Sequence, residues 1–77
     1  MFPNGKNKKP IHTAEQIGAL VRQHRKDQKL TQKELAGLSG VGVRFISELE
    51  RGKESCELGK TLHILAMLGI PLLMDSF

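Results

Sequence analysis

Apolar residues recur along this chain at intervals of three and four, which is the period of an amphipathic helix rather than of a strand. Such positions share one face of a helix, and the first stripe consists of Ile17, Leu20, Val21 and His24. Thr13 precedes this stripe, and Gln16 stands three residues after it, as in a capping box. We therefore expect a helix that opens at Thr13 and runs to about Gln28.

A second capping box predicts another helix. Thr31 is followed three residues later by Glu34, so a helix is expected from about Gln32 to Leu38. Leu35 and Leu38 are one turn apart in this helix, and we expect both to face a core.

Glycines mark the limits of a third helix. Gly40 forms a sharp corner, because glycine tolerates the positive φ that such a turn requires. The helix starts near Gly42 or Val43 and stops at Gly52, which stands where a left-handed C-cap belongs. The positions of this helix that point inward are Ile46 and Leu49.

A fourth helix is expected from Glu57 or Leu58 to Leu68. Gly69 follows its last turn as a capping glycine, and Pro71 prevents a regular helix from continuing. The side chains that we expect to pack on the other helices are Leu58, Leu62, Leu65 and Leu68, with Ile64 and Met67 beside them.

The last segment, residues 70–77, is rich in apolar residues, but the chain holds no second predicted strand for it. A lone strand leaves its backbone polar groups unpaired, whereas the same segment of a second subunit can pair with it across a two-fold axis. We therefore predict an antiparallel two-stranded sheet between subunits, formed by Leu72, Leu73 and Met74. A frayed tail or an extra turn packed on its own domain is the alternative.

The net charge of +4 is unevenly distributed. Residues 1–33 carry eight basic and two acidic side chains, hence a net +6, whereas residues 34–77 carry four basic and six acidic ones, hence a net −2. A basic front suits a polyphosphate partner such as nucleic acid. The alternative is an ordinary solvated surface with a disordered basic tail. In that case Lys6, Lys8 and Lys9 only keep the chain soluble and do not contact DNA.

The chain offers little chemistry beyond charge. It has no paired-carboxylate cleft, Gly-rich phosphate loop or nucleophile with a base, so we expect no enzyme. The histidines and the single cysteine, Cys56, match no zinc spacing, so we expect no metal and no cofactor. The free thiol and the lack of an apolar run of membrane-spanning length predict a cytoplasmic, nucleoid-associated protein without membrane contact.

Residues 31–52, TQKELAGLSGVGVRFISELERG, carry the most specific pattern of the sequence. Ala36 is small where two helices would cross, Gly40 is at the corner, and Val41 lies behind it. With its Thr-Gln start and Leu-Glu-Arg-Gly ending, the stretch resembles the helix-turn-helix of the lambda-repressor-like (Cro, XRE) family. The resemblance covers about Ala14 to Leu68, and a generic αα-hairpin in a small bundle is the alternative.

The resemblance and the patterns together imply an all-α, lambda-repressor-like DNA-binding domain of four or five helices with a short C-terminal β-strand that pairs across a dimer. We divide the chain into a flexible basic arm (1–11), the helix-turn-helix domain (12–69) and the dimerisation strand (70–77). A domain of 77 residues buries only about 60% of its unfolded surface, which also favours a homodimer.

Two sets of residues are expected to contact DNA. Exposed side chains of the second motif helix read base edges in the major groove, and these are Val43, Arg44, Ser47 and Glu48. Arg44 matches the O6 and N7 atoms of guanine, whereas Glu48 accepts from cytosine, discourages wrong sequences or folds back onto an arginine. The expected phosphate contacts, among which that of Gln32 is implied by the resemblance, are Thr31, Gln32, Lys33 and Lys53.

The resemblance also implies an ion pair and a biological role. Arg25 and Glu50 occupy the positions at which the family pairs an arginine of the first helix with a glutamate of the recognition helix. The LGI-PLLMD ending is similar to antitoxins of the Hip type. Those are small dimers that repress their own operon and bind a Hip-family serine/threonine kinase toxin.

The sequence therefore predicts a dimeric repressor of a palindromic operator on double-stranded DNA that acts as the antitoxin of a type II toxin–antitoxin module. A stand-alone repressor, of the phage type or a restriction–modification controller, is the first alternative. A protein-interaction module that has lost DNA binding is the second.

Overall fold

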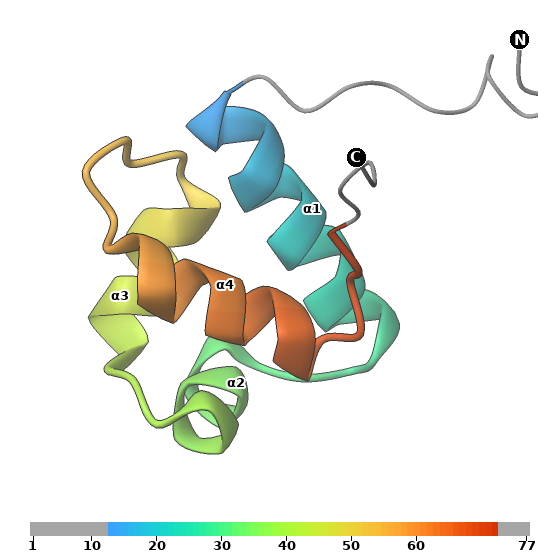
Figure 1. The fold of residues 1–77 in the computed structure, drawn as a ribbon. Helices are drawn as coiled ribbons and strands as arrows, with labels where there is room; N and C mark the ends of the chain where they lie inside the picture. Colours follow the sequence, from blue (N-terminus) through green and yellow to red (C-terminus); the bar gives the residue numbers. More distant parts are fainter. Residues whose placement is uncertain (1–12, 73–77) are drawn as a thin grey trace, which may run out of the picture.

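The computed structural model describes residues 13–72, and within this range the chain is all-helical, without a strand (Figure 1). The helices are α1 (Ala14–Asp27), α2 (Gln32–Ser39), α3 (Val43–Glu50) and α4 (Leu58–Met67). The predicted basic arm at 1–11 lies outside the described residues, as do Leu73 and Met74 of the predicted strand. Leu72 is described, and it is exposed and not part of a strand.

Both predicted capping boxes are present. Thr13 Oγ1 accepts from the backbone N–H of Gln16 at 3.1 Å, and Thr31 Oγ1 accepts from that of Glu34 at 3.0 Å. In return, the side-chain oxygens of Gln16 and Glu34 accept from the backbone N–H groups of the two threonines, at 3.1 and 2.8 Å. These pairs determine where α1 and α2 begin.

The four helices end in the same way. In each, a residue with positive φ follows the last turn, and the next N–H reaches back five residues to a carbonyl of the helix, as in a Schellman motif. Gly40, Gly52 and Gly69 take this position after α2, α3 and α4, with φ of 70°, 87° and 75°. After α1 the position is held by Lys29 at φ 60°, which the sequence did not indicate.

The core lies where the helices meet, because each contributes apolar side chains to it. α3 packs against α1 and α2, and α4 packs against α2. The fully buried side chains at the centre are Val21, Leu35, Ile46 and Ile64. The segment after α4 returns along α1 (Figure 1), and Ile70 from this segment is buried in the core.

One inward position of α2 was wrongly predicted. Leu35 is buried, but Leu38 is more than half exposed. The buried face of α2 consists instead of Leu35, Ala36 and Ser39. The helix is therefore rotated so that its two small residues face the core, because a small side chain lets a neighbouring helix approach closely.

The inward face of α4 was also partly wrong. Leu65 and Leu68 are buried as predicted, but Leu58 and Leu62 are exposed. Ile64 is also buried as predicted, whereas Met67 is exposed, and the buried side of the helix additionally carries Thr61. Thr61 is tolerated there because its hydroxyl donates to the backbone carbonyl of Glu57 at 2.9 Å, which satisfies the buried donor. Apolar residues lie nearly all around α4, so periodicity alone does not distinguish its faces.

A glycine in α1 determines how closely α3 approaches. A Cβ atom added to Gly18 would lie 2.3 Å from the carbonyl oxygen of Leu49 and 2.8 Å from that of Glu50. The last carbonyls of α3 therefore rest directly on the surface of α1. This role of Gly18 was not predicted, although an isolated glycine inside a helical pattern often marks such a contact.

Candidate nucleic-acid interface

The predicted base-reading residues lie on one side of α3 and differ in exposure. The Arg44 side chain is 87% exposed, and Val43 is also exposed, whereas Ser47 is half-buried and the Glu48 side chain is only 22% exposed. The N-cap of α3 is Gly42, which has no side chain to cap the first N–H groups of the helix. The beginning of α3 therefore presents open backbone donors beside the exposed guanidinium of Arg44.

The N-terminus of α2 also retains donors. Its capping box occupies the backbone N–H groups of Thr31 and Glu34. The N–H groups of Gln32 and Lys33 belong to the first turn, so they have no carbonyl partner within the helix. Together with the positive end of the helix dipole and the exposed Lys33, they form a site that suits a phosphate oxygen.

Arg25 and Glu50 form the predicted ion pair, which links α1 to the end of α3. Arg25 Nε lies 2.6 Å from Glu50 Oε2, and a terminal guanidinium nitrogen donates to Oε1 at 3.0 Å. The other terminal nitrogen donates to the carbonyl of Leu30 at 2.7 Å. Both side chains are nearly buried, so the bidentate geometry and the third hydrogen bond are needed to offset the loss of hydration.

The side chain of Gln32, which was predicted to contact phosphate, has a hydrogen-bond partner within the domain. Its Nε2 donates to Glu50 Oε1 at 3.1 Å, so the Gln32 side chain joins the Arg25–Glu50 pair to α2. Burial raises the pKa of Glu50, but the hydrogen bonds from Arg25 and Gln32 and the Arg25 charge outweigh it and leave that pKa below its usual value. This network, which sequence reasoning found only in part, joins α1, α2 and α3.

Glu48 does not stand free on α3, because two of the predicted DNA contacts bind it. Arg44 Nε donates to Glu48 Oε2 at 3.3 Å, and Lys53 Nζ donates to Oε1 at 3.1 Å. The hydrogen bond from Lys53 is the main cause that holds the pKa of Glu48 below its usual value; burial opposes it, and Arg44 contributes to the lowering. Of the three expectations for Glu48, the structure shows the fold-back onto an arginine.

Residues 21–71 match the helix-turn-helix family. The uncharacterized HTH-type transcriptional regulator y4mF of Sinorhizobium fredii (strain NBRC 101917 / NGR234) is 56% identical over 61 residues, which are 79% of this chain and 80% of that protein. This chain belongs to the Cro/XRE helix-turn-helix family of transcriptional regulators. The family is not an enzymatic class, in keeping with the sequence.

Solved structures of HipB share the fold of this Cro/XRE regulator. The HipA-HipB-O2-O3 complex contains a chain that superposes with a TM-score of 0.78 at 23% identity, and the match covers 90% of the regulator and 97% of that chain. The HipB-O4 20mer complex gives the same TM-score, identity and coverage. At this level of identity the likeness concerns the fold.

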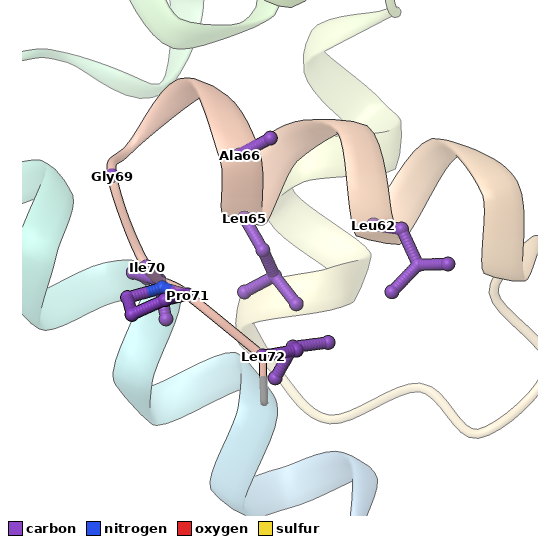
Figure 2. A pocket seen from close by; sticks show the side chains of 7 residues that line it. All are labelled: Leu62, Leu65, Ala66, Gly69, Ile70, Pro71 and Leu72. Carbon is purple, nitrogen blue, oxygen red and sulfur yellow. The ribbon is translucent and has the colours of Figure 1, made fainter. Parts of the chain in front are cut away.

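The regulator has a second surface feature, an apolar groove of about 440 Å³ beside α4. Figure 2 shows Leu62 and Leu65 projecting from α4 toward Leu72, which follows Ile70 and Pro71 along the other side. Leu62 and Leu72 are exposed although both are apolar. Apolar side chains gathered around one hollow are a common feature of interaction surfaces.

Two further features of the described part of the regulator concern metal ions and membranes. Residues 13–72 contain no cluster of three or more His, Cys, Asp or Glu side chains placed to bind a metal ion. None of the helices there is both long and apolar enough to cross a membrane. Cys56 is a half-buried free thiol next to the core.

Proposed function

We propose that this regulator is a sequence-specific repressor that inserts α3 into the major groove of its operator. One observation carries the proposal: the half of α3 that carries exposed side chains also starts with uncapped N–H groups, while its other end is anchored through Glu50. A recognition helix needs both an accessible reading edge and a fixed orientation. The contacts of Glu50 supply the fixed orientation, because they connect α3 to α1 and α2.

Within this proposal, Arg44 makes the principal base contact. Its side chain is 87% exposed, and its fork of N–H donors matches guanine O6 and N7. Val43 contacts a thymine methyl group. Ser47, near the centre of α3, hydrogen-bonds to a base edge. The phosphate contacts come from the start of α2, with Lys33, and from Lys53 after α3.

Two alanine variants test these roles, because base and phosphate contacts have different signatures. Arg44→Ala should reduce the preference for particular base pairs by about 1–3 kcal/mol, since it removes a bidentate base contact. Lys53→Ala should weaken binding to all sequences alike and lower the slope of log K against log salt by about one. Fluorescence anisotropy with a duplex selected from a random pool and with calf-thymus DNA measures both quantities. Unchanged affinity and preference in Arg44→Ala would contradict the proposal.

We also propose that the regulator binds a palindrome as a homodimer. One domain contacts too few base pairs for a specific site, whereas a symmetric dimer reads two half-sites about 34 Å apart, or at a related spacing. The apolar groove between α4 and Leu72, followed by the predicted strand residues Leu73 and Met74, supports pairing at this end of the domain. Analytical ultracentrifugation at micromolar concentration is the direct measurement.

We further propose that the repressor is the antitoxin of a Hip-type serine/threonine kinase. The proposal is supported by the resemblance of the LGI-PLLMD ending and by the fold shared with HipB, which forms a complex with HipA. Co-expression with a kinase gene adjacent to its own should give a co-purifying complex and suppress the growth defect caused by the kinase alone. No such neighbour, or no complex with it, would leave the stand-alone repressor as the better description.

A further inference from the structure

The carboxylate of Glu48 bridges two cations that come from different parts of the motif. Arg44 lies one turn earlier on α3 and binds Oε2, whereas Lys53 lies beyond the end of the helix and binds Oε1. Each oxygen therefore has a charged donor. A single acceptor group thus connects the most exposed side chain of the reading face with the loop that follows the helix.

The backbone strengthens the link to Lys53. The carbonyl of Glu48 accepts from the backbone N–H of Lys53 at 3.1 Å, and from that of Arg51 at 3.2 Å. Gly52, at φ 87°, turns the chain so that Lys53 comes back beside α3. Residue 53 is therefore held to Glu48 by both its backbone and its ammonium group.

The contact with Arg44 leaves its reading edge available. Glu48 engages Nε, and no terminal guanidinium nitrogen of Arg44 has a partner among the described residues. A guanidinium held at Nε still directs its two terminal N–H₂ groups outward, where they can donate side by side to one base. Holding the long side chain in advance also reduces the conformational freedom that it loses on binding.

We propose that Glu48 is a positioning residue that holds Arg44 and Lys53 in one register on the duplex, rather than a reader of bases. The inference rests on the proposed function of α3 and extends it to specificity. The low exposure of Glu48 and the contacts of both its oxygens favour this role, because each oxygen already accepts from a cation. Glu48 also cancels one of two positive charges, so it lowers the affinity for DNA of any sequence.

The test measures sequence discrimination and salt dependence together. The probes are a duplex selected by the wild-type protein from a random pool, its single-base variants and calf-thymus DNA. Glu48→Ala should lose about fivefold or more in discrimination, at the same base pairs as Arg44→Ala. The double variant of Arg44 and Glu48 should lose no more discrimination than Arg44→Ala alone. Glu48→Ala should also bind calf-thymus DNA more tightly, with a salt slope steeper by about one.

Two matched variants separate position from charge. Glu48→Gln removes the charge but keeps an oxygen that can accept from one cation. It should therefore steepen the salt slope as much as Glu48→Ala does, but retain part of the discrimination. Glu57→Gln removes one charge from the exposed Glu57–Lys60 pair on α4 and should leave discrimination unchanged. Thermal melts confirm that each variant is folded.

Two results would overturn the inference. If Glu48→Ala relaxed the preference at a base pair whose preference Arg44→Ala does not change, Glu48 would be a direct reader of that base pair. If Glu48→Ala bound selected and calf-thymus DNA more tightly by the same factor, with discrimination unchanged, Glu48 would act only through its charge. Failure of the proposed function is visible separately, since the wild-type protein would then show no discrimination before Glu48 is changed.

Discussion

At the scale of single residues, Gly18 shows how one position determines the approach of two helices. Glycine inside a helix normally costs about 1 kcal/mol relative to alanine, so propensity alone favours its replacement. The carbonyl oxygens of α3 would lie within 3 Å of the new methyl group, and they belong to backbone that cannot move aside alone. The steric cost should therefore exceed the gain in propensity.

We predict that Gly18→Ala lowers the free energy of unfolding by about 1–3 kcal/mol, as overpacking of a close contact does. The matched control is Gly37→Ala in α2, where nothing lies within 4 Å of the added Cβ. That variant should raise stability by roughly 0.5–1 kcal/mol. Urea denaturation followed by circular dichroism measures both values, and similar effects of the two substitutions would argue against the close contact.

The second prediction at this scale concerns Glu50, whose side chain is only 3% exposed. Glu50→Ala leaves the Arg25 guanidinium buried without its partner, and we expect a loss of about 3–5 kcal/mol in unfolding free energy. The exposed pair of Glu57 with Lys60 is the control, since Glu57→Ala should cost less than about 1 kcal/mol. A loss below about half a kcal/mol for Glu50→Ala would show that the pair does not stabilise the fold.

The same carboxylate should make stability sensitive to acid. The pKa of Glu50 is lower in the folded chain than its ordinary 4.5, so the unfolded state binds the proton more readily. Its stabilising contribution is therefore complete above about pH 4.5 and is lost as the pH falls through the lowered pKa. Wild-type unfolding free energy should decline below that pH more steeply than that of Glu50→Gln. Parallel curves would contradict this account.

At the scale of elements, the two capping boxes have the same hydrogen bonds but different surroundings. Thr31 starts α2, whose first turn keeps two open N–H groups beside Lys33, whereas Thr13 starts α1. Thr31→Ala and Thr13→Ala should each destabilise the fold by about 1 kcal/mol. Only Thr31→Ala should also weaken DNA binding, because it loosens the proposed phosphate site. Thermal melts and anisotropy measure the two effects, and equal loss of binding in both variants would contradict that site.

Helix limits and helix faces differed in how far the sequence could predict them. The capping residues and the terminal glycines are local signals, so the limits of α2, α3 and α4 were nearly correct. Which side of α2 and α4 is buried depends on neighbours that are distant in the sequence. The exposed Leu38, Leu58 and Leu62 and the buried Thr61 are therefore the places where the helical period misled.

At the scale of the whole molecule, the apolar groove beside α4 bears on assembly. Leu62 lines the groove and is 43% exposed, whereas Met67, on the same helix and 42% exposed, does not line it. We predict that Leu62→Glu shifts a dimer toward monomer, because it puts a charge into the proposed apolar contact, and that Met67→Glu does not. Sedimentation velocity at several concentrations gives the populations. A dimer unaffected by Leu62→Glu would move the interface elsewhere.

The sequence by itself determined the all-α class and the helix starts and stops. It also indicated the pairing of Arg25 with Glu50, through a family resemblance. The helix limits depend on short-range hydrogen bonding, whereas Arg25 and Glu50, which are 25 residues apart in the chain, were matched only through the pattern of the family. Tertiary structure alone decided that Gly18 must be small, that Gln32 joins the Arg25–Glu50 pair, and that Lys53 returns to bind Glu48. Each of these arises only when helices or loops approach in space, and a linear pattern does not encode that distance.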